Sequence, residues 1–110
     1  MTNFTHYRDH IGTNADKFYK ATLFHGDQLL VGLNCLQPGQ IQAVHDHADQ
    51  DKVYVVMEGR GRFTVGAEIR EAAQGEVVWA AAGVPHGVEN VDDSENLVVL
   101  VCIAPPPARK

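Results

Sequence analysis

Short apolar runs broken by turn-forming residues dominate this chain of 110 residues. No segment shows a sustained 3.6-residue period, and β-branched and aromatic residues cluster between glycine, proline, asparagine and aspartate. The pattern predicts nine short strands, at residues 17–24, 29–36, 41–47, 52–57, 62–65, 68–72, 76–80, 86–89 and 97–104. A sheet of so many short strands must close or double over to hide its edges, so we expect an all-β sandwich or barrel.

The length suits one domain with a core of ordinary size. We expect an irregular N-terminal segment over residues 1–15, with at most one turn of helix, and a β-barrel domain over residues 16–104. Three consecutive prolines begin at Pro105 and end the last predicted strand, so residues 105–110 are expected to form a C-terminal tail.

The composition argues against several classes of function. The formal net charge is −5 and no basic run is present, which argues against a nucleic-acid or anionic-membrane partner. The N-terminus lacks the apolar stretch of a signal peptide, and the longest apolar run, 97–104, is far shorter than the roughly 20 residues that span a bilayer. Cys35 and Cys102 lie in strand-like runs and are expected as reduced thiols. Cytoplasmic residence is the default expectation.

Three histidines form the candidate chemical site. His45 and His47 are two residues apart in a predicted strand, so their side chains are expected on the same face as a bidentate metal clamp. His86 follows Pro85 and opens another predicted strand, where the fixed φ of the proline holds it in place. Such histidines can be core polar groups, but three of them on two rigid strands favour a common metal ion.

Two sequence motifs surround these histidines. The stretch from Gly39 to Gly59 matches G-x5-H-x-H-x(3–4)-E-x6-G at its glycines and histidines, and the stretch from Gly75 to Asn90 matches G-x5-P-x-G-x2-H-x3-N, with Ala81 at the proline position. Over residues 29–104 the chain therefore resembles the cupins, small β-barrels that carry both motifs in this order. The resemblance implies a cupin-type jelly-roll β-barrel, also called a double-stranded β-helix, with the metal held inside it.

One position departs from the cupin pattern. The glutamate ligand of the first motif is replaced by Lys52 or, with the shorter spacing, by Asp51. Three arrangements stay open: a three-histidine site completed by water, Gln50 as a neutral oxygen ligand, or Asp51 turned inward. A lysine cation near a metal is repulsive, so we expect Lys52 to turn outward or to line the mouth of the barrel. Nothing in the sequence indicates a lowered pKa for this lysine.

The resemblance implies a protein that binds a divalent ion such as Fe, Zn, Mn or Ni and acts on a small molecule. A metal-dependent enzyme, dioxygenase-like or isomerase-like, is the first hypothesis; a non-catalytic small-molecule or sugar-binding module without tight metal is the alternative. A metal-free epimerase-like reaction with His47 and Tyr54 is a third. Compact cupins are commonly dimers, so the resemblance also implies a homodimer. The expected core or pocket residues are Tyr54, Val56, Phe63, Trp79 and Val88.

Overall fold

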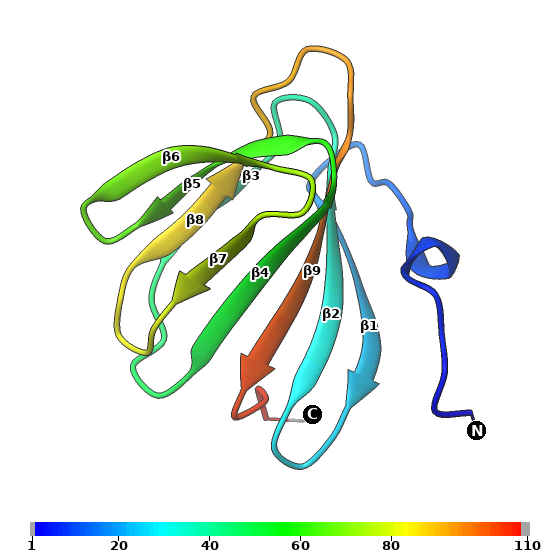
Figure 1. Ribbon diagram of the computed structural model, residues 1–110, viewed down its shortest axis with the longest axis vertical. Coiled ribbons are helices and arrows are strands. Elements are labelled where there is room, and N and C mark those ends of the chain that lie inside the picture. Colours follow the sequence, from blue (N-terminus) through cyan, green and yellow to red (C-terminus); the bar gives the residue numbers. More distant parts are fainter. Residues whose placement is uncertain (1, 109–110) are drawn as a thin grey trace.

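The computed structural model describes residues 2–108, and nine strands and one short 3-10 helix form within that range (Figure 1). Every predicted strand is present, with ends shifted by a few residues. Residue 1 of the expected N-terminal segment and residues 109 and 110 of the expected tail lie outside the described range. The element bounds are η1 Tyr7–His10, β1 Tyr19–His25, β2 Leu30–Leu36, β3 Ile41–His45, β4 Asp51–Glu58, β5 Arg60–Val65, β6 Glu68–Ala73, β7 Val77–Ala80, β8 His86–Glu89 and β9 Leu97–Ala104.

The strands form two antiparallel sheets. A five-stranded sheet has the order β1-β2-β9-β4-β7, and a four-stranded sheet has the order β3-β8-β5-β6. From β2 to β5 and from β6 to β9 the chain changes sheet at each connection, which gives the jelly-roll arrangement (Figure 1). The hydrogen-bonded ladders of the described residues do not join into one closed barrel, so the jelly roll is a two-layer sandwich with separate sheets.

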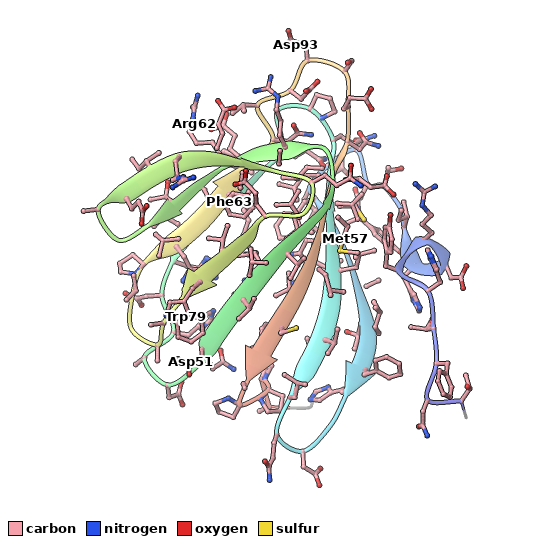
Figure 2. The ribbon with its side chains drawn as sticks, viewed as in Figure 1. Asp51, Met57, Arg62, Phe63, Trp79 and Asp93 are labelled. Atoms are coloured by element: carbon pink, nitrogen blue, oxygen red, sulfur yellow. The ribbon has the colours of Figure 1, made fainter. Side chains whose placement is uncertain are left out.

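The core fills the space between the two sheets. Because side chains alternate along a strand, every second residue of β4 points inward: Lys52, Tyr54 and Val56 are buried, and the residues between them are more exposed. The expected core residues Tyr54, Val56, Phe63 and Val88 belong to this cluster. Trp79 does not belong to this core, because its side chain is 55% exposed (Figure 2), but it does line a pocket together with Phe63 and Val78. Trp79 is opposite Val53, one of the β4 residues that alternate with the inward-pointing ones.

The N-terminal segment packs on the outer face of the five-stranded sheet. Tyr7 of η1 contacts a second apolar cluster built on Leu33, Cys35 and Val98. Its hydroxyl donates a hydrogen bond to Glu58 at 2.7 Å, and Arg8 makes an ion pair with the same carboxylate at 3.0 Å. The expected irregular segment is therefore anchored to the end of β4.

Asn90, the last residue of the second motif, has a structural role. Its side chain is 1% exposed, and its amide nitrogen donates to the carbonyls of Leu36 and Glu95 at 2.8 and 2.9 Å. These bonds join the end of β8 to the end of β2 and to the loop before β9. The motif asparagine therefore holds together the end of the sandwich opposite the histidines.

The other end of the sandwich gathers the residues of the candidate site. β3 and β7 end there, and β4 and β8 begin there (Figure 1). The strand register confirms the arrangement, because His45 is opposite His86, Lys52 is opposite Ala80 and Asp51 is opposite Ala104. Within the described residues, no helix has the length and apolar character that crossing a membrane requires.

Candidate metal centre

His45 and His86 occupy paired positions on adjacent strands of the four-stranded sheet. His45 is the last residue of β3, His86 is the first residue of β8, and the two stand opposite each other in the ladder. Their ring centroids are 4.5 Å apart. His45 is half-buried, whereas His86 is only 2% exposed. The fold therefore brings together two residues that are 41 positions apart in the sequence and fixes both on strands.

Each of these two rings is oriented by the backbone in the same way. Nδ1 of His45 is 2.8 Å from the carbonyl oxygen of Ala43, and Nδ1 of His86 is 2.9 Å from that of Val84. A carbonyl oxygen only accepts, so Nδ1 carries the proton in both rings and Nε2 is the lone-pair nitrogen. Nε2 of His86 is buried and has no hydrogen-bond partner among the described residues. An oriented imidazole with a free Nε2 is the form in which histidine binds a metal.

His47 is held less firmly. The prediction that His47 lies in a strand is wrong. β3 contains an irregularity between Gln42 and His45 and ends at His45. His47 lies in the following loop and is exposed, although its backbone carbonyl accepts a hydrogen bond from Gly83 N–H at 2.9 Å. Its ring centroid is 4.9 Å from that of His45 and 6.1 Å from that of His86. The three histidines do come together, but not through strand alternation.

The ring spacings fit a common ion for two of the three histidine pairs. Imidazoles that bind one ion through Nε2 at about 2.0–2.1 Å have ring centroids roughly 5 Å apart. The 4.5 and 4.9 Å spacings around His45 match this value, and the 6.1 Å between His47 and His86 exceeds it. In the part of the chain that the structure describes, no three His, Cys, Asp or Glu side chains already surround one ion position. His47 must therefore rotate inward to complete a three-histidine set.

The electrostatics of His86 favour the neutral imidazole. Burial lowers its pKa most, and its electrostatic interactions with Lys52, His45 and His47 lower it further, against an opposing effect of the Val84 hydrogen bond. A metal ligand must be unprotonated, so a histidine with a lowered pKa needs to lose no proton near neutral pH.

Lys52 points inward beside this cluster. It is 5% exposed, and its Nζ lies 4.8 Å from the centroid of the Tyr54 ring. Of the two expected orientations, the outward one is wrong, because Lys52 has the inward parity of β4. The pKa of Lys52 is also lowered, which the sequence did not indicate. Burial, and secondarily the charge of Lys20, lower it to about 8. This effect could not be predicted from the sequence, because the burial of Lys52 depends on how β4 packs and Lys20 is distant along the chain.

Gln50 and Asp51, the two candidate fourth ligands, make other bonds. The side-chain nitrogen of Gln50 donates to the carbonyl of Pro105 at 3.1 Å. Asp51 accepts the N–H of Ala82 at 2.9 Å, at the end where β4 begins (Figure 2). Within the described residues, the hydrogen bonds of both side chains therefore go to backbone atoms rather than to the histidine rings.

Sequence reasoning missed one polar connection near the site. The hydroxyl of Tyr54 donates to the side-chain oxygen of Gln42 at 2.8 Å, which links β4 of one sheet to β3 of the other. The Tyr54 ring is also 6.2 Å from the His86 ring, centroid to centroid. Alternation from His45 would put Gln42 on the opposite face, so the sequence carried no signal for this contact; the irregularity between the two residues places Gln42 opposite Val88 and His45 opposite His86.

The fold and the site together define a small jelly-roll protein with histidines gathered at one end of its sandwich. Residues 32–103 match the model of the cupin domain family. The chain belongs to the cupins. The sequence is 45% identical over 76 residues to the uncharacterized protein SCO3923 of Streptomyces coelicolor, covering 69% of this chain and 70% of that protein. It is 31% identical to the uncharacterized protein MJ1618 of Methanocaldococcus jannaschii, over 62% of this chain and 54% of that protein.

Solved structures show the same architecture. The crystal structure of TT1209 from Thermus thermophilus superimposes with a TM-score of 0.92 at 37% identity, covering 96% of this chain and 100% of that one. An RmlC-like cupin from Desulfovibrio desulfuricans gives a TM-score of 0.77 at 30% identity, over 88% of this chain and 91% of that one. A double-stranded β-helix protein from Klebsiella pneumoniae, at 17% identity and a TM-score of 0.89, shares the fold over 99% of this chain and 95% of its own.

Proposed function

We propose that this cupin binds one divalent metal ion through the Nε2 atoms of His45, His47 and His86. The observation that carries the proposal is the buried Nε2 of His86, which has no partner in the part of the chain that the structure describes and belongs to a ring oriented by the Val84 carbonyl. An unpaired buried polar atom costs on the order of 1–3 kcal/mol, so a ligand that satisfies it stabilises the site. His45 has the same orientation and stands opposite His86.

The ligand set that we propose is neutral. Imidazoles accept several first-row ions, including Fe, Zn, Mn and Ni, and three neutral ligands leave the charge of the ion uncompensated. When bound, such an ion supplies Lewis acidity and open coordination positions for a small-molecule substrate. We therefore propose a metal-dependent enzyme of the dioxygenase-like or isomerase-like kind, in which the exposed His47 side of the site is the open side.

Gln50 stays a prediction as a fourth ligand. Its amide would have to exchange the hydrogen bond with the Pro105 carbonyl for a place beside the histidines. Asp51 would likewise have to leave the Ala82 N–H. We propose that both side chains keep these bonds and that solvent or substrate completes the coordination.

Titration with Zn²⁺ tests the metal site. Protein treated with a chelator and then dialysed is titrated by calorimetry, as wild type and as the His86→Ala and His10→Ala variants. We expect one tight site in the wild type and in His10→Ala, whose altered residue lies in η1, and no tight site in His86→Ala. Unchanged affinity in His86→Ala, with a native circular dichroism spectrum, would overturn the proposal.

One observation favours the alternative of a non-catalytic small-molecule or sugar-binding module. The positive charge of Lys52 acts on His86 and opposes a cation bound beside it. Elemental analysis of protein purified without chelator, from cells supplied with each candidate metal in turn, separates the two functions. Metal content far below one ion per chain under every supply favours the binding module.

We also propose that the protein forms a homodimer through the outer face of the five-stranded sheet. Val77 and Trp79, two residues apart on the same face of β7, are 64% and 55% exposed. Exposed apolar side chains grouped in this way are typical of protein contacts. Light scattering on wild type and on Trp79→Ser is the test: we expect a dimer in the first and a monomer in the second, and a monomeric wild type would contradict the proposal.

A further inference from the structure

A small cavity lies on the inner side of the five-stranded sheet, next to the histidine cluster. Its volume is about 150 Å³, and its walls come from β1, β2, β4 and β9, with Gln42 of β3 and Pro107 after β9. The polar residues of the wall are Lys20, Thr22, Asn34, Gln42 and Lys52, and its apolar part includes Val101 and Ile103. The charged residues of this lining, within the described chain, are two lysines and no carboxylate.

Lys52 faces the cavity without a counter-charge. Its side chain is 5% exposed, and among the described residues its one close polar contact is the face of the Tyr54 ring, 4.8 Å from Nζ. No hydrogen bond or ion pair joins it to the described part of the protein. Burying an ammonium group without a partner is costly, and an anion in the cavity would remove that cost.

Lys20 adds a second positive charge to the same space. It stands opposite Asn34 in the β1–β2 ladder and lines the cavity from the more exposed side. Its charge acts on Lys52 and lowers the pKa of that lysine, which places the two ammonium groups within electrostatic reach of each other. Two cations that converge on one cavity create a positive potential that attracts an anion.

The neutral polar groups of the wall are available as donors. The side-chain oxygen of Gln42 already accepts the hydroxyl of Tyr54, which leaves the NH₂ group of Gln42 to donate. Asn34 is 6% exposed and presents a second side-chain amide to the cavity. Amide and ammonium donors around one space suit the oxygens of a carboxylate.

The size and the apolar wall restrict the ligand further. A cavity of about 150 Å³ has the volume of roughly five liquid waters. Val101 and Ile103 offer carbon surface but no hydrogen bond, so a short carbon chain fits there better than water. A small organic acid meets both requirements, whereas inorganic phosphate leaves the apolar wall uncovered.

We propose that this cavity binds a short-chain organic carboxylate. Lys52 and Lys20 pair with its negative charge, and the side-chain amides of Asn34 and Gln42 donate hydrogen bonds to its oxygens. Because Lys52 and the Tyr54 ring both adjoin His86, the bound acid lies beside the proposed metal site. The assignment of this acid as substrate rests on the proposed function, but the binding of the anion needs no metal. Lys52 thus takes the place of the motif carboxylate as a substrate-binding group.

The test uses chelator-treated protein at low ionic strength, titrated with butyrate, succinate, inorganic phosphate and the neutral analogue butyramide. We expect saturable binding of butyrate or succinate, and affinity at least about tenfold lower for butyramide, because hydrogen bonds to a charged group contribute roughly 1.5–3 kcal/mol. In ¹H–¹⁵N spectra, the side-chain amide signals of Asn34 and Gln42 should shift on binding.

Two lysine variants identify the site. Lys52→Met keeps the length of the side chain and removes its charge, and we expect it to lose at least about tenfold in affinity. Lys17→Met removes an exposed lysine outside the cavity and should bind as the wild type does. Equal binding by Lys52→Met and the wild type, no carboxylate binding, or tight binding of phosphate alone would overturn the carboxylate site.

His86→Ala separates this proposal from the proposed function. If His86→Ala binds no metal but still binds butyrate, both proposals hold. If metal binding fails in the wild type but butyrate still binds in a Lys52-dependent way, the carboxylate site stands and the metal-dependent activity falls. If the wild type binds metal but no carboxylate, the proposed metal site stands and the carboxylate site falls.

Discussion

His45 and His86 stand opposite each other across the β3–β8 ladder, with ring centroids 4.5 Å apart and each Nδ1 bonded to the carbonyl two residues before it. The repeated hydrogen bond fixes the same tautomer in both rings. Two of the three rings of the proposed metal site are therefore preorganised on strands, and the third ring, His47, lies on a loop beside them.

Because His47 is less firmly placed than the two strand histidines, the three single His→Ala variants are predicted to lose metal affinity by different amounts. We expect His47→Ala to lower Zn²⁺ affinity less than His45→Ala or His86→Ala does, because part of the binding free energy of His47 is spent on fixing a loop side chain. Competition with a chromophoric chelator measures the three affinities. Equal losses in all three variants would show that His47 is as well oriented as the strand histidines.

The Tyr54–Gln42 hydrogen bond predicts unequal costs for its two partners. Gln42→Leu leaves the fully buried hydroxyl of Tyr54 without an acceptor and should lower the free energy of unfolding by about 1–3 kcal/mol. Tyr54→Phe removes the hydroxyl itself and should cost less, about 1 kcal/mol. Urea unfolding of both variants and of the double variant gives the coupling energy. A coupling near zero would mean that the bond does not hold the sheets together.

Lys52→Met is expected to stabilise the metal-free protein. The buried ammonium lacks a counter-ion among the described residues, and its pKa falls from 10.5 to about 8, so its charge opposes folding by about 3 kcal/mol near neutral pH. Lys17→Met, at an exposed position, is the matched control and should change the free energy of unfolding by less than about 0.5 kcal/mol. A Lys52→Met variant less stable than the wild type would contradict an unpaired buried charge.

The same lysine predicts a pH dependence. Between pH of about 8 and 10.5 the unfolded chain binds more protons at Lys52 than the folded chain does, so wild-type stability rises with pH across this window. The advantage of Lys52→Met should be largest below pH 8 and should shrink toward pH 10.5. Urea unfolding of both proteins across this range is the measurement, and a constant difference would refute the lowered pKa.

Two motif glycines are predicted to differ in their tolerance of a side chain. Gly59 and Gly75 have φ of 78° and 91°, so alanine is strained at either position. A Cβ at Gly59 would also collide with the backbone carbonyl of Asn96, whereas a Cβ at Gly75 meets nothing within 4 Å. We expect Gly75→Ala to cost about 1–2 kcal/mol and Gly59→Ala clearly more. Thermal unfolding compares them, and equal costs would contradict the close approach at Gly59.

The sequence predicted the nine strands because each run carries its own apolar pattern and its own turn residues. The structure also confirms the cupin family and the jelly-roll form, which only the two motifs implied. The strand assignment of His47 failed because the irregularity in β3 ends that strand early, and alternation gives no warning of a bulge. The burial of Lys52 and the exposure of Trp79 both follow from the register of β4, which a single sequence does not reveal.

The carboxylate cavity was equally out of reach of the sequence. Lys20, Asn34 and Lys52 come from three strands, and only their pairing order brings them to one wall. Charge patterns along the chain describe neighbours in sequence, whereas this cavity depends on neighbours in the sheet.

The most direct test of the central claim is an anomalous difference map from a crystal of the protein loaded with Zn²⁺. The account predicts one strong peak about 2.0–2.1 Å from the Nε2 atoms of His45, His47 and His86, with His47 rotated toward the other two rings. A peak at another site, or a loaded crystal in which Nε2 of His86 has no metal beside it, would contradict the account.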